Sequence, residues 1–501
     1  MSETSTTDPS AFTATEALAR MRGGSLSARA LLEACIAQRD LVDPAVNAMV
    51  TRCDDRALAE ADAADEAMAA GRDLGPLHGL PVAIKDLQAT EGVTTTYGSG
   101  FFADNVPDQD SGIVARVRAA GGIVVGKTNI PEMSIGANTV NRLFGATGNP
   151  FDVDLSCGGS SGGSAVALAT NMAPLATGSD HGGSLRIPAC YCGVVGHRSS
   201  PGLVPNESRT ITQTNYSVQG PMARTVADAS LLLSVLSTRD RTSRLDPMAY
   251  PNDGARFGSL DDVDLAELKV GVTPDLGGVM VSESVRTTFA DRVGRMGEFV
   301  GDVREIAVDL TDASSIDWQL RADVFATQYH RDIDRYDEGF NPNIRRTYEN
   351  ALTTTVLDVA KARRRQMELY QRFDEVFDEV DVVVCPGVSV PPFPWRDLYP
   401  RTVDGAPVDN YMAWLALSSS LTVVGTPVTA LPAGLDAQGT PFGLQLVGPM
   451  HSDHRLLSIA GALEAAFALD PHLHRPVPDL EALARTDSRC AIDGRTVQLE
   501  G

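Results

Sequence analysis

Two glycine-rich segments in the middle of the chain, each carrying serine hydroxyls, restrict its folding more than any other feature. The first reads Cys-Gly-Gly-Ser-Ser-Gly-Gly-Ser-Ala over residues 157–165, and the second reads Ser-Asp-His-Gly-Gly-Ser-Leu-Arg-Ile-Pro-Ala over 179–189. Glycines allow positive φ angles and let another group approach the backbone closely. The intervening sequence predicts a buried helix over 164–171 and a short buried strand over 174–178. Loops that leave such strands are where α/β proteins hold their reactive groups.

The first segment also has three more ordinary interpretations. Runs of glycine and serine usually form flexible linkers, but a linker would not be followed directly by an apolar helix and a buried strand. A phosphate-binding loop would need Gly-Lys-Ser/Thr, or Gly-x-Gly-x-x-Gly after a strand, and the segment has neither. Residues 158–162 also match Gly-x-Ser-x-Gly, the nucleophile turn of α/β-hydrolases, which would require an acid and then a histidine downstream.

Both segments together resemble the signature of the amidase signature family of serine hydrolases. The resemblance is carried by residues 158–165 and 180–189, and Leu-Pro-Val-Ala-Ile-Lys-Asp at 80–86 resembles the lysine strand of that family. Further matches lie at 126–132, 220–228 and 443–448. The matches follow one another in the same order and extend from about residue 25 to about residue 470, so the resemblance covers most of the chain.

This resemblance assigns catalytic roles to three side chains. Ser184 would be the nucleophile, Ser160 the bridging serine after a cis peptide bond to Gly159, and Lys85 the base. Lysine acts as a base only when it is neutral, and an ordinary pKa of about 10.4 leaves about one molecule in a few thousand neutral at pH 7. Burial behind an apolar strand over 80–84 could lower the pKa enough. Lys85 would then take a proton from Ser160 while Ser160 takes one from Ser184, and an acyl-enzyme would form.

The second glycine-rich segment is expected to stabilise the oxyanion, because glycines let a loop turn its N–H groups into one pocket. The predicted donors are the N–H groups of His181, Gly182, Gly183 and Ser184. Asp180 and Arg186 are expected to pair and hold the loop, and Ser161 is expected to form local hydrogen bonds.

His181 departs from the family pattern, which more often has an aliphatic, aromatic or small residue there. An Asp180, His181, Ser184 triad is an alternative, but neighbouring residues on a tight loop seldom converge in that way, and Lys85 would then have no role. The sequence favours His181 as a wall of the acyl pocket. Tyr191 and Trp318 are further predicted substrate-binding residues. The pocket walls are expected to come from the segments near 191, over 318–329 and over 391–411.

Composition limits the partners of the chain. Its 501 residues include 65 acidic and 42 basic side chains, a net charge of −23 that disfavours nucleic acid. Its seven cysteines lack metal-ligand or disulfide spacing, and no segment is apolar enough to cross a bilayer. We therefore expect no cofactor, no metal and no membrane partner. The start of the chain lacks a secretory signal, which predicts a cytoplasmic protein. An acidic surface would also suit a salty habitat.

Alternating strand and helix patterns predict an α/β fold, with one large mixed β-sheet flanked by helices on both faces. The predicted organisation is a disordered N-terminus over 1–12, an N-terminal helical layer over 13–75, a catalytic domain over 76–475 and a C-terminal tail over 476–501. Among the later elements, a strand is expected over 305–308.

The sequence thus predicts an amidase that hydrolyses small carboxamides, anilides or related linear or cyclic amides. One alternative is the glutaminase subunit of a tRNA-dependent amidotransferase, whose loop usually has glutamine where Ile187 precedes Pro188 here. Another is a non-catalytic binding protein on an amidase scaffold. The substrate, esterase or carbamate side activities and the oligomeric state stay open, with a homodimer as one option.

Overall fold

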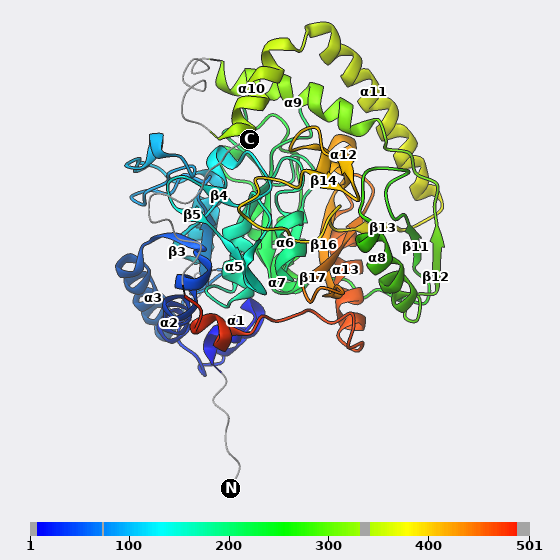
Figure 1. Cartoon of the computed structure of the whole chain (residues 1–501). Coiled ribbons are helices and arrows are strands. Elements are labelled where there is room, and N and C mark those ends of the chain that lie inside the picture. The colour runs from blue at the N-terminus through cyan, green and yellow to red at the C-terminus, as the bar shows by residue number, and fades with distance from the viewer. Residues whose placement is uncertain (1–7, 73–74, 331–340, 488–501) are drawn as a thin grey trace.

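An eleven-stranded sheet runs through the whole molecule in the computed structural model, which describes residues 8–72, 75–330 and 341–487 (Figure 1). In spatial order its strands are β1 (Met49–Arg52), β3 (Ile123–Thr128), β2 (Pro81–Lys85), β8 (Leu175–Asp180), β10 (Val218–Ala223), β9 (Val195–Arg198), β16 (Val428–Leu435), β17 (Pro441–Val447), β13 (Val382–Pro386), β11 (Lys269–Val272) and β12 (Asp302–Glu305). Three small ribbons lie outside it: β4 (Val140–Asn141) with β5 (Gly145–Ala146), β6 (Gly148–Asn149) with β7 (Asp152–Ser156), and β14 (Thr402–Val403) with β15 (Ala406–Pro407).

The sheet is mixed. Strands β3, β2 and β8 are parallel neighbours, as are β13, β11 and β12, whereas the strands from β8 through β10, β9, β16 and β17 to β13 alternate in direction. Because β2 and β8 are parallel neighbours, their carboxyl ends lie at the same edge of the sheet. This edge brings Lys85 and Ser179 together.

Helices flank the sheet. Their bounds are α1 (Ala14–Arg22), α2 (Ala28–Val46), α3 (Asp54–Ala69), α4 (Gly112–Ala119), α5 (Gly162–Ala169), α6 (Arg186–Cys192), α7 (Val226–Leu236), α8 (Glu283–Met296), α9 (Ala313–Tyr329), α10 (Pro342–Thr353), α11 (Val356–Asp374), α12 (Ala416–Val424), α13 (Asp453–Phe467) and α14 (Leu480–Ala484). The short α5 and α6 pack on each other and on the central strands, as do α7 and α13. Figure 1 shows α9, α10 and α11 gathered at one end of the molecule, away from α1, α2 and α3. The predicted α/β fold with one large mixed sheet is confirmed.

Several local expectations need correction. The strand predicted over 305–308 occurs three residues earlier, as β12, and Pro9–Ala11 forms a 3-10 helix capped by Asp8 within the segment expected to be disordered. Residues 1–7 of that segment, and residues 488–501 of the expected tail, lie outside the described residues. Five helices were not anticipated: α6, α9, α10, α12 and α14. The most important of them is α9, because it forms a wall of the site.

Small residues let the central helix lie close to the sheet. Every residue of α5 is buried, and a Cβ atom added to Gly163 would lie 2.4 Å from the backbone nitrogen of Asn129. Only glycine permits this approach. It holds the loop before α5 against the carboxyl ends of β2 and β8. Among the described residues, the structure has no helix with the length and apolar character needed to span a membrane.

Candidate active site

A buried lysine at the end of β2 organises a cluster of hydroxyl groups. Lys85 Nζ lies 2.7 Å from Ser160 Oγ, 2.9 Å from Ser161 Oγ and 2.9 Å from Ser179 Oγ. The peptide bond between Gly159 and Ser160 is cis, as the resemblance implies. Burial lowers the pKa of Lys85 to about 7, although the negative charge of Asp180 opposes the shift. A large share of Lys85 is therefore neutral near pH 7.

The three hydroxyls around Lys85 differ in what else they contact. Ser161 Oγ donates to the carbonyl oxygen of Ser179 at 3.4 Å and accepts from the N–H of Ser179 at 3.4 Å. Its proton is therefore engaged with the backbone. Ser160 and Ser179 both line a cavity, and Ser160 has the shorter contact with Lys85, 2.7 Å against 2.9 Å. Ser160 is thus the hydroxyl best placed to pass a proton between the cavity and the lysine.

Ser184 lines the same cavity as Ser160. No hydrogen bond joins the two hydroxyls in the described structure; the backbone N–H of Ser161 instead donates to the carbonyl oxygen of Ser184 at 3.2 Å. One of the two expected proton-transfer contacts, Lys85 to Ser160, is present. Hydrogen bonds between catalytic groups are often long without substrate and shorten when it binds.

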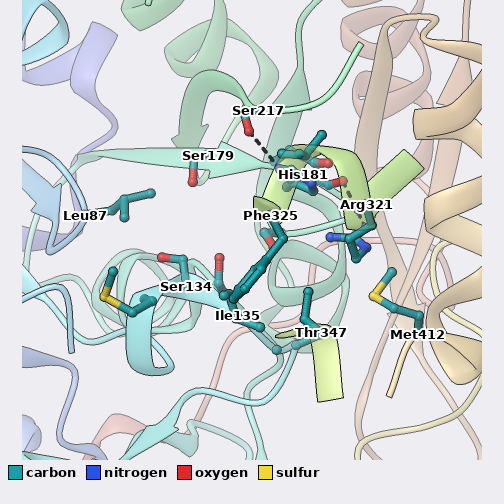
Figure 2. Close-up of a pocket in the computed structure, with 18 of the residues that line it drawn as sticks. Leu87, Ser134, Ile135, Ser179, His181, Ser217, Arg321, Phe325, Thr347 and Met412 are labelled. Carbon is teal, nitrogen blue, oxygen red and sulfur yellow. Dashed lines mark hydrogen bonds between the residues drawn. The ribbon is translucent and has the colours of Figure 1, made fainter. Parts of the chain in front are cut away.

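The cavity has a volume of about 170 Å³ and is largely apolar. Its apolar walls include Leu87, Ile135, Ile187, Val324, Phe325 and Leu415. Figure 2 shows Leu87 and Ser179 on one side of the view, and Arg321 and Met412 on the other. The space suits an apolar acyl or aryl group beside a few polar anchors.

The loop between β8 and α6 is expected to supply the oxyanion donors, and the structure divides these N–H groups into two sets. The N–H of Gly183 donates to Asp180 Oδ1 at 2.9 Å, so this group is engaged within the loop. The N–H groups of Gly182 and Ser184 have no acceptor among the residues that the structure describes. Gly182, Ser184 and His181 line the cavity. The prediction that Gly183 supplies a free donor therefore needs correction.

A buried carboxylate holds this loop in place. Asp180 accepts hydrogen bonds from Arg186 Nε at 2.9 Å, Arg186 Nη2 at 3.0 Å and Arg198 Nη1 at 3.1 Å, besides those from Gly183 and Leu185. These positive charges and donors hold the pKa of Asp180 well below its usual range, against the opposing effect of burial. Sequence reasoning missed Arg198. The available signal was weaker than for Lys85, because His197 separates Arg198 from the apolar run over 193–196.

Replacing Asp180 by asparagine should destabilise the protein by about 3–5 kcal/mol, because two buried guanidinium groups would lose their counter-charge. Urea unfolding at pH 7 would measure the loss. Asp302→Asn is the matched control, since Asp302 pairs with Arg304 on the surface and exposed pairs contribute about 0–1 kcal/mol. Equal effects of the two substitutions would contradict the structural role of Asp180.

His181 does not form a triad with its neighbours. Its Nδ1 lies 2.7 Å from Ser217 Oγ, and its buried Nε2 has no partner among the described residues (Figure 2). Burial, reinforced by the charges of Arg321 and Arg198, lowers the pKa of His181 well below its ordinary value. It is therefore a neutral side chain on the cavity wall, and Asp180 bonds to arginines rather than to its ring.

Two predicted pocket residues lie elsewhere. Tyr191 is buried in α6, where its hydroxyl donates to the carbonyl oxygen of Val390 at 2.9 Å, and it does not line the cavity. Trp318 is also absent from the wall and packs edge-on against Tyr411 at 6.3 Å between ring centroids. The part of the wall that α9 contributes begins at Arg321, one turn beyond Trp318, and extends to Tyr329. The helical spacing of Leu320 and Val324 is the sequence signal that could have placed these residues on a helix.

Comparisons with known proteins identify the family of the chain. The family model described as Amidase matches residues 30–457. An acylamidase from Rhodococcus erythropolis is 32% identical over 457 residues, which cover 91% of this chain and 95% of that protein. A glutamyl-tRNA(Gln) amidotransferase component from Chromohalobacter salexigens is 32% identical over 493 residues, covering 93% of this chain and 98% of its own.

A solved structure agrees as well. A bacterial aryl acylamidase of the amidase signature family superposes with a TM-score of 0.83 at 25% sequence identity, covering 95% of this chain and 99% of its own. The family match extends over most of the chain and includes the lysine strand and both glycine-rich segments. The chain therefore belongs to the amidase signature family of hydrolases, which act on C–N bonds.

Proposed function

We propose that this protein hydrolyses amides through an acyl-enzyme formed on Ser184. The proposal depends on one observation. The buried amine of Lys85 lies 2.7 Å from Ser160 Oγ, and Ser160 lines the same cavity as Ser184. An amide carbonyl is a poor electrophile and needs an activated nucleophile, oxyanion donors and a proton for the leaving nitrogen. The cavity has candidates for all three.

In the proposed reaction, Ser184 Oγ attacks the amide carbon while its proton passes to Ser160 and the Ser160 proton passes to neutral Lys85. The oxyanion that forms accepts hydrogen bonds from the N–H groups of Gly182 and Ser184. The relay then reverses and protonates the leaving nitrogen, the C–N bond breaks, and the acyl group stays on Ser184 as an ester. Water, activated by the same relay, hydrolyses that ester and frees the carboxylic acid.

The proposed substrates are small carboxamides and anilides. The apolar walls contributed by Ile135, Val324 and Phe325 support an apolar acyl or aryl group. The similarity to an acylamidase and to an aryl acylamidase supports the same class. The glutaminase component of an amidotransferase is the second candidate, which the similarity to a glutamyl-tRNA(Gln) amidotransferase component favours.

A panel of aliphatic amides, anilides, amino-acid amides and glutamine, assayed for release of ammonia or aniline by the isolated chain, tests the proposal. We expect turnover of amides or anilides without a partner, and covalent labelling by a fluorophosphonate that Ser184→Ala abolishes. Glutamine turnover that requires a second protein would favour the amidotransferase candidate. A chain that neither labels nor turns over any amide would be the non-catalytic alternative.

The pH dependence of the reaction should follow Lys85. Its pKa of about 7 means that the neutral, basic form increases as the pH rises through 7. We expect kcat/KM for a neutral amide to increase about tenfold per pH unit below this pKa and to level off above about pH 8. A profile measured from pH 5 to 9 that is flat or that falls with pH would contradict a lysine base.

A further inference from the structure

Arg321 stands out on the wall of the cavity because it is a charged group with an unused buried donor. It lies on α9 and is 9% exposed. Val324 and Phe325 follow it by three and four residues, so they lie on the same face of the helix and also line the cavity. The hydrogen bonds of Arg321 to Asp317 and to the carbonyl oxygen of His181 use Nη2, and the guanidinium also interacts with the hydroxyl of Tyr411. Its buried Nε has no acceptor among the described residues.

The contacts of Nη2 position the guanidinium beside the oxyanion loop. This nitrogen lies 3.2 and 3.3 Å from the two carboxylate oxygens of Asp317, one turn earlier on α9, and 3.4 Å from the carbonyl oxygen of His181. A Cβ atom added to Gly182 would lie 3.0 Å from it. Figure 2 shows the Arg321 side chain between Phe325 and Met412, close to His181. The guanidinium is thus held beside Gly182, which lies two residues before Ser184 in the oxyanion loop.

Arg321 is the cationic side chain on the wall of the cavity, and it pairs with Asp317 outside the wall. Among the described lining residues, Asp180 and Arg321 are the only ones of the Asp, Glu, Lys and Arg types. The carboxylate of Asp180 is already engaged by Arg186 and Arg198. Asp317 is the counter-ion of Arg321 at 3.2 Å and also accepts a hydrogen bond from the hydroxyl of Tyr216 at 2.8 Å. A buried donor without a partner is unfavourable, and a ligand oxygen would relieve this.

We infer that Arg321 binds a carboxylate at the far end of the acyl group, so that the preferred substrates are monoamides of short dicarboxylic acids. A guanidinium binds a carboxylate through paired N–H donors, and a neutral alkyl end would leave Nε unpaired. We assign the carboxylate to the acyl side because the leaving amine must depart and water must enter, whereas the acyl chain stays bound through both steps. The inference rests on the proposed amidase function and narrows its substrate class.

Matched pairs of amides test this inference: malonamate with propanamide, succinamate with butanamide, and glutaramate with pentanamide. In each pair a carboxylate replaces a methyl group. We expect the wild type at pH 8 to prefer the acid in at least one pair, by about tenfold or more in kcat/KM. Arg321→Met should lower that ratio to one or below, and Arg321→Lys should retain part of it. The ratio within one enzyme cancels a general loss of active protein.

Arg363→Met provides the control, because Arg363 pairs with Asp323 on the outer side of α9 and does not line the cavity. Its ratio should equal that of the wild type. A wild type that turns over the neutral amides with no preference for any acid overturns the inference and leaves the amidase function standing, as does a preference that Arg321→Met retains. Failure to turn over any amide or anilide overturns both.

Discussion

Replacing Ser184 by alanine is expected to lower kcat/KM for amide hydrolysis by about four orders of magnitude or more, because the variant has no oxygen to form the acyl-enzyme. The same substitution should leave the free energy of unfolding close to that of the wild type. The Ser184 hydroxyl is half-buried on the cavity wall and has no hydrogen-bond partner among the described residues, so its removal leaves no buried group unsatisfied. Steady-state kinetics and urea unfolding of the same preparation would measure both quantities.

The matched control is Ser199→Ala. Ser199 is fully buried on the strand edge after β9, where its hydroxyl donates to the carbonyl oxygen of Gln219 at 3.1 Å, and it does not line the cavity. Its loss should cost about 1 kcal/mol of stability while the enzyme keeps its turnover. The mechanism would be overturned by a Ser184→Ala protein that retains more than about one hundredth of wild-type turnover, since such a rate exceeds what binding and oxyanion donors alone supply.

Sequence reasoning located the fold and the centre of the site because their signals are local. The apolar run before Lys85 and the small residues of 162–169 each prescribe a buried element with little dependence on the rest of the chain. The resulting sheet edge brings Lys85, Ser160 and Ser179 within hydrogen-bond distance. Contacts between separate strands were harder to foresee. Arg198 on β9 bonds to Asp180 at the end of β8, and neither segment alone indicates the other.

The pocket walls were the least predictable part. Arg321 reaches the oxyanion loop from a helix 140 residues further along the chain, as its contact with the His181 carbonyl shows. Which turn of α9 faces the cavity depends on how α9 packs against α10, α11 and α12, and therefore on contacts that no single segment encodes. Trp318 belongs to the segment expected to form the wall, yet it lies one turn before Arg321, where the lining residues of α9 begin. A large aromatic residue more often fills the core than a substrate pocket.

Replacing Lys85 by methionine is expected to lower kcat/KM by about 10²- to 10⁴-fold, the usual contribution of a general base. The stability of this variant relative to the wild type should also depend on pH. Burial lowers the pKa of Lys85 to about 7 in the folded protein, whereas an unfolded lysine has a pKa of about 10.4. Between these values the unfolded chain binds more protons, so wild-type stability increases with pH there. The reduction in the free energy of unfolding caused by burying Lys85 is greatest below pH 7 and decreases as the pH rises toward about 10.4.

The gain in stability of Lys85→Met over the wild type should therefore be larger at pH 6 than at pH 9, by about 2–3 kcal/mol. Lys127→Met is the matched control. Burial lowers the pKa of Lys127 to about 8, and its amine contacts Thr90 and Thr95 rather than a serine of the cavity. Both variants should show the same sign of pH dependence in urea unfolding, since both remove a buried amine, but only Lys85→Met should lose turnover. If the two variants had equal activity, the buried amine of Lys85 would affect stability but not catalysis, and Lys85 would be excluded as the base.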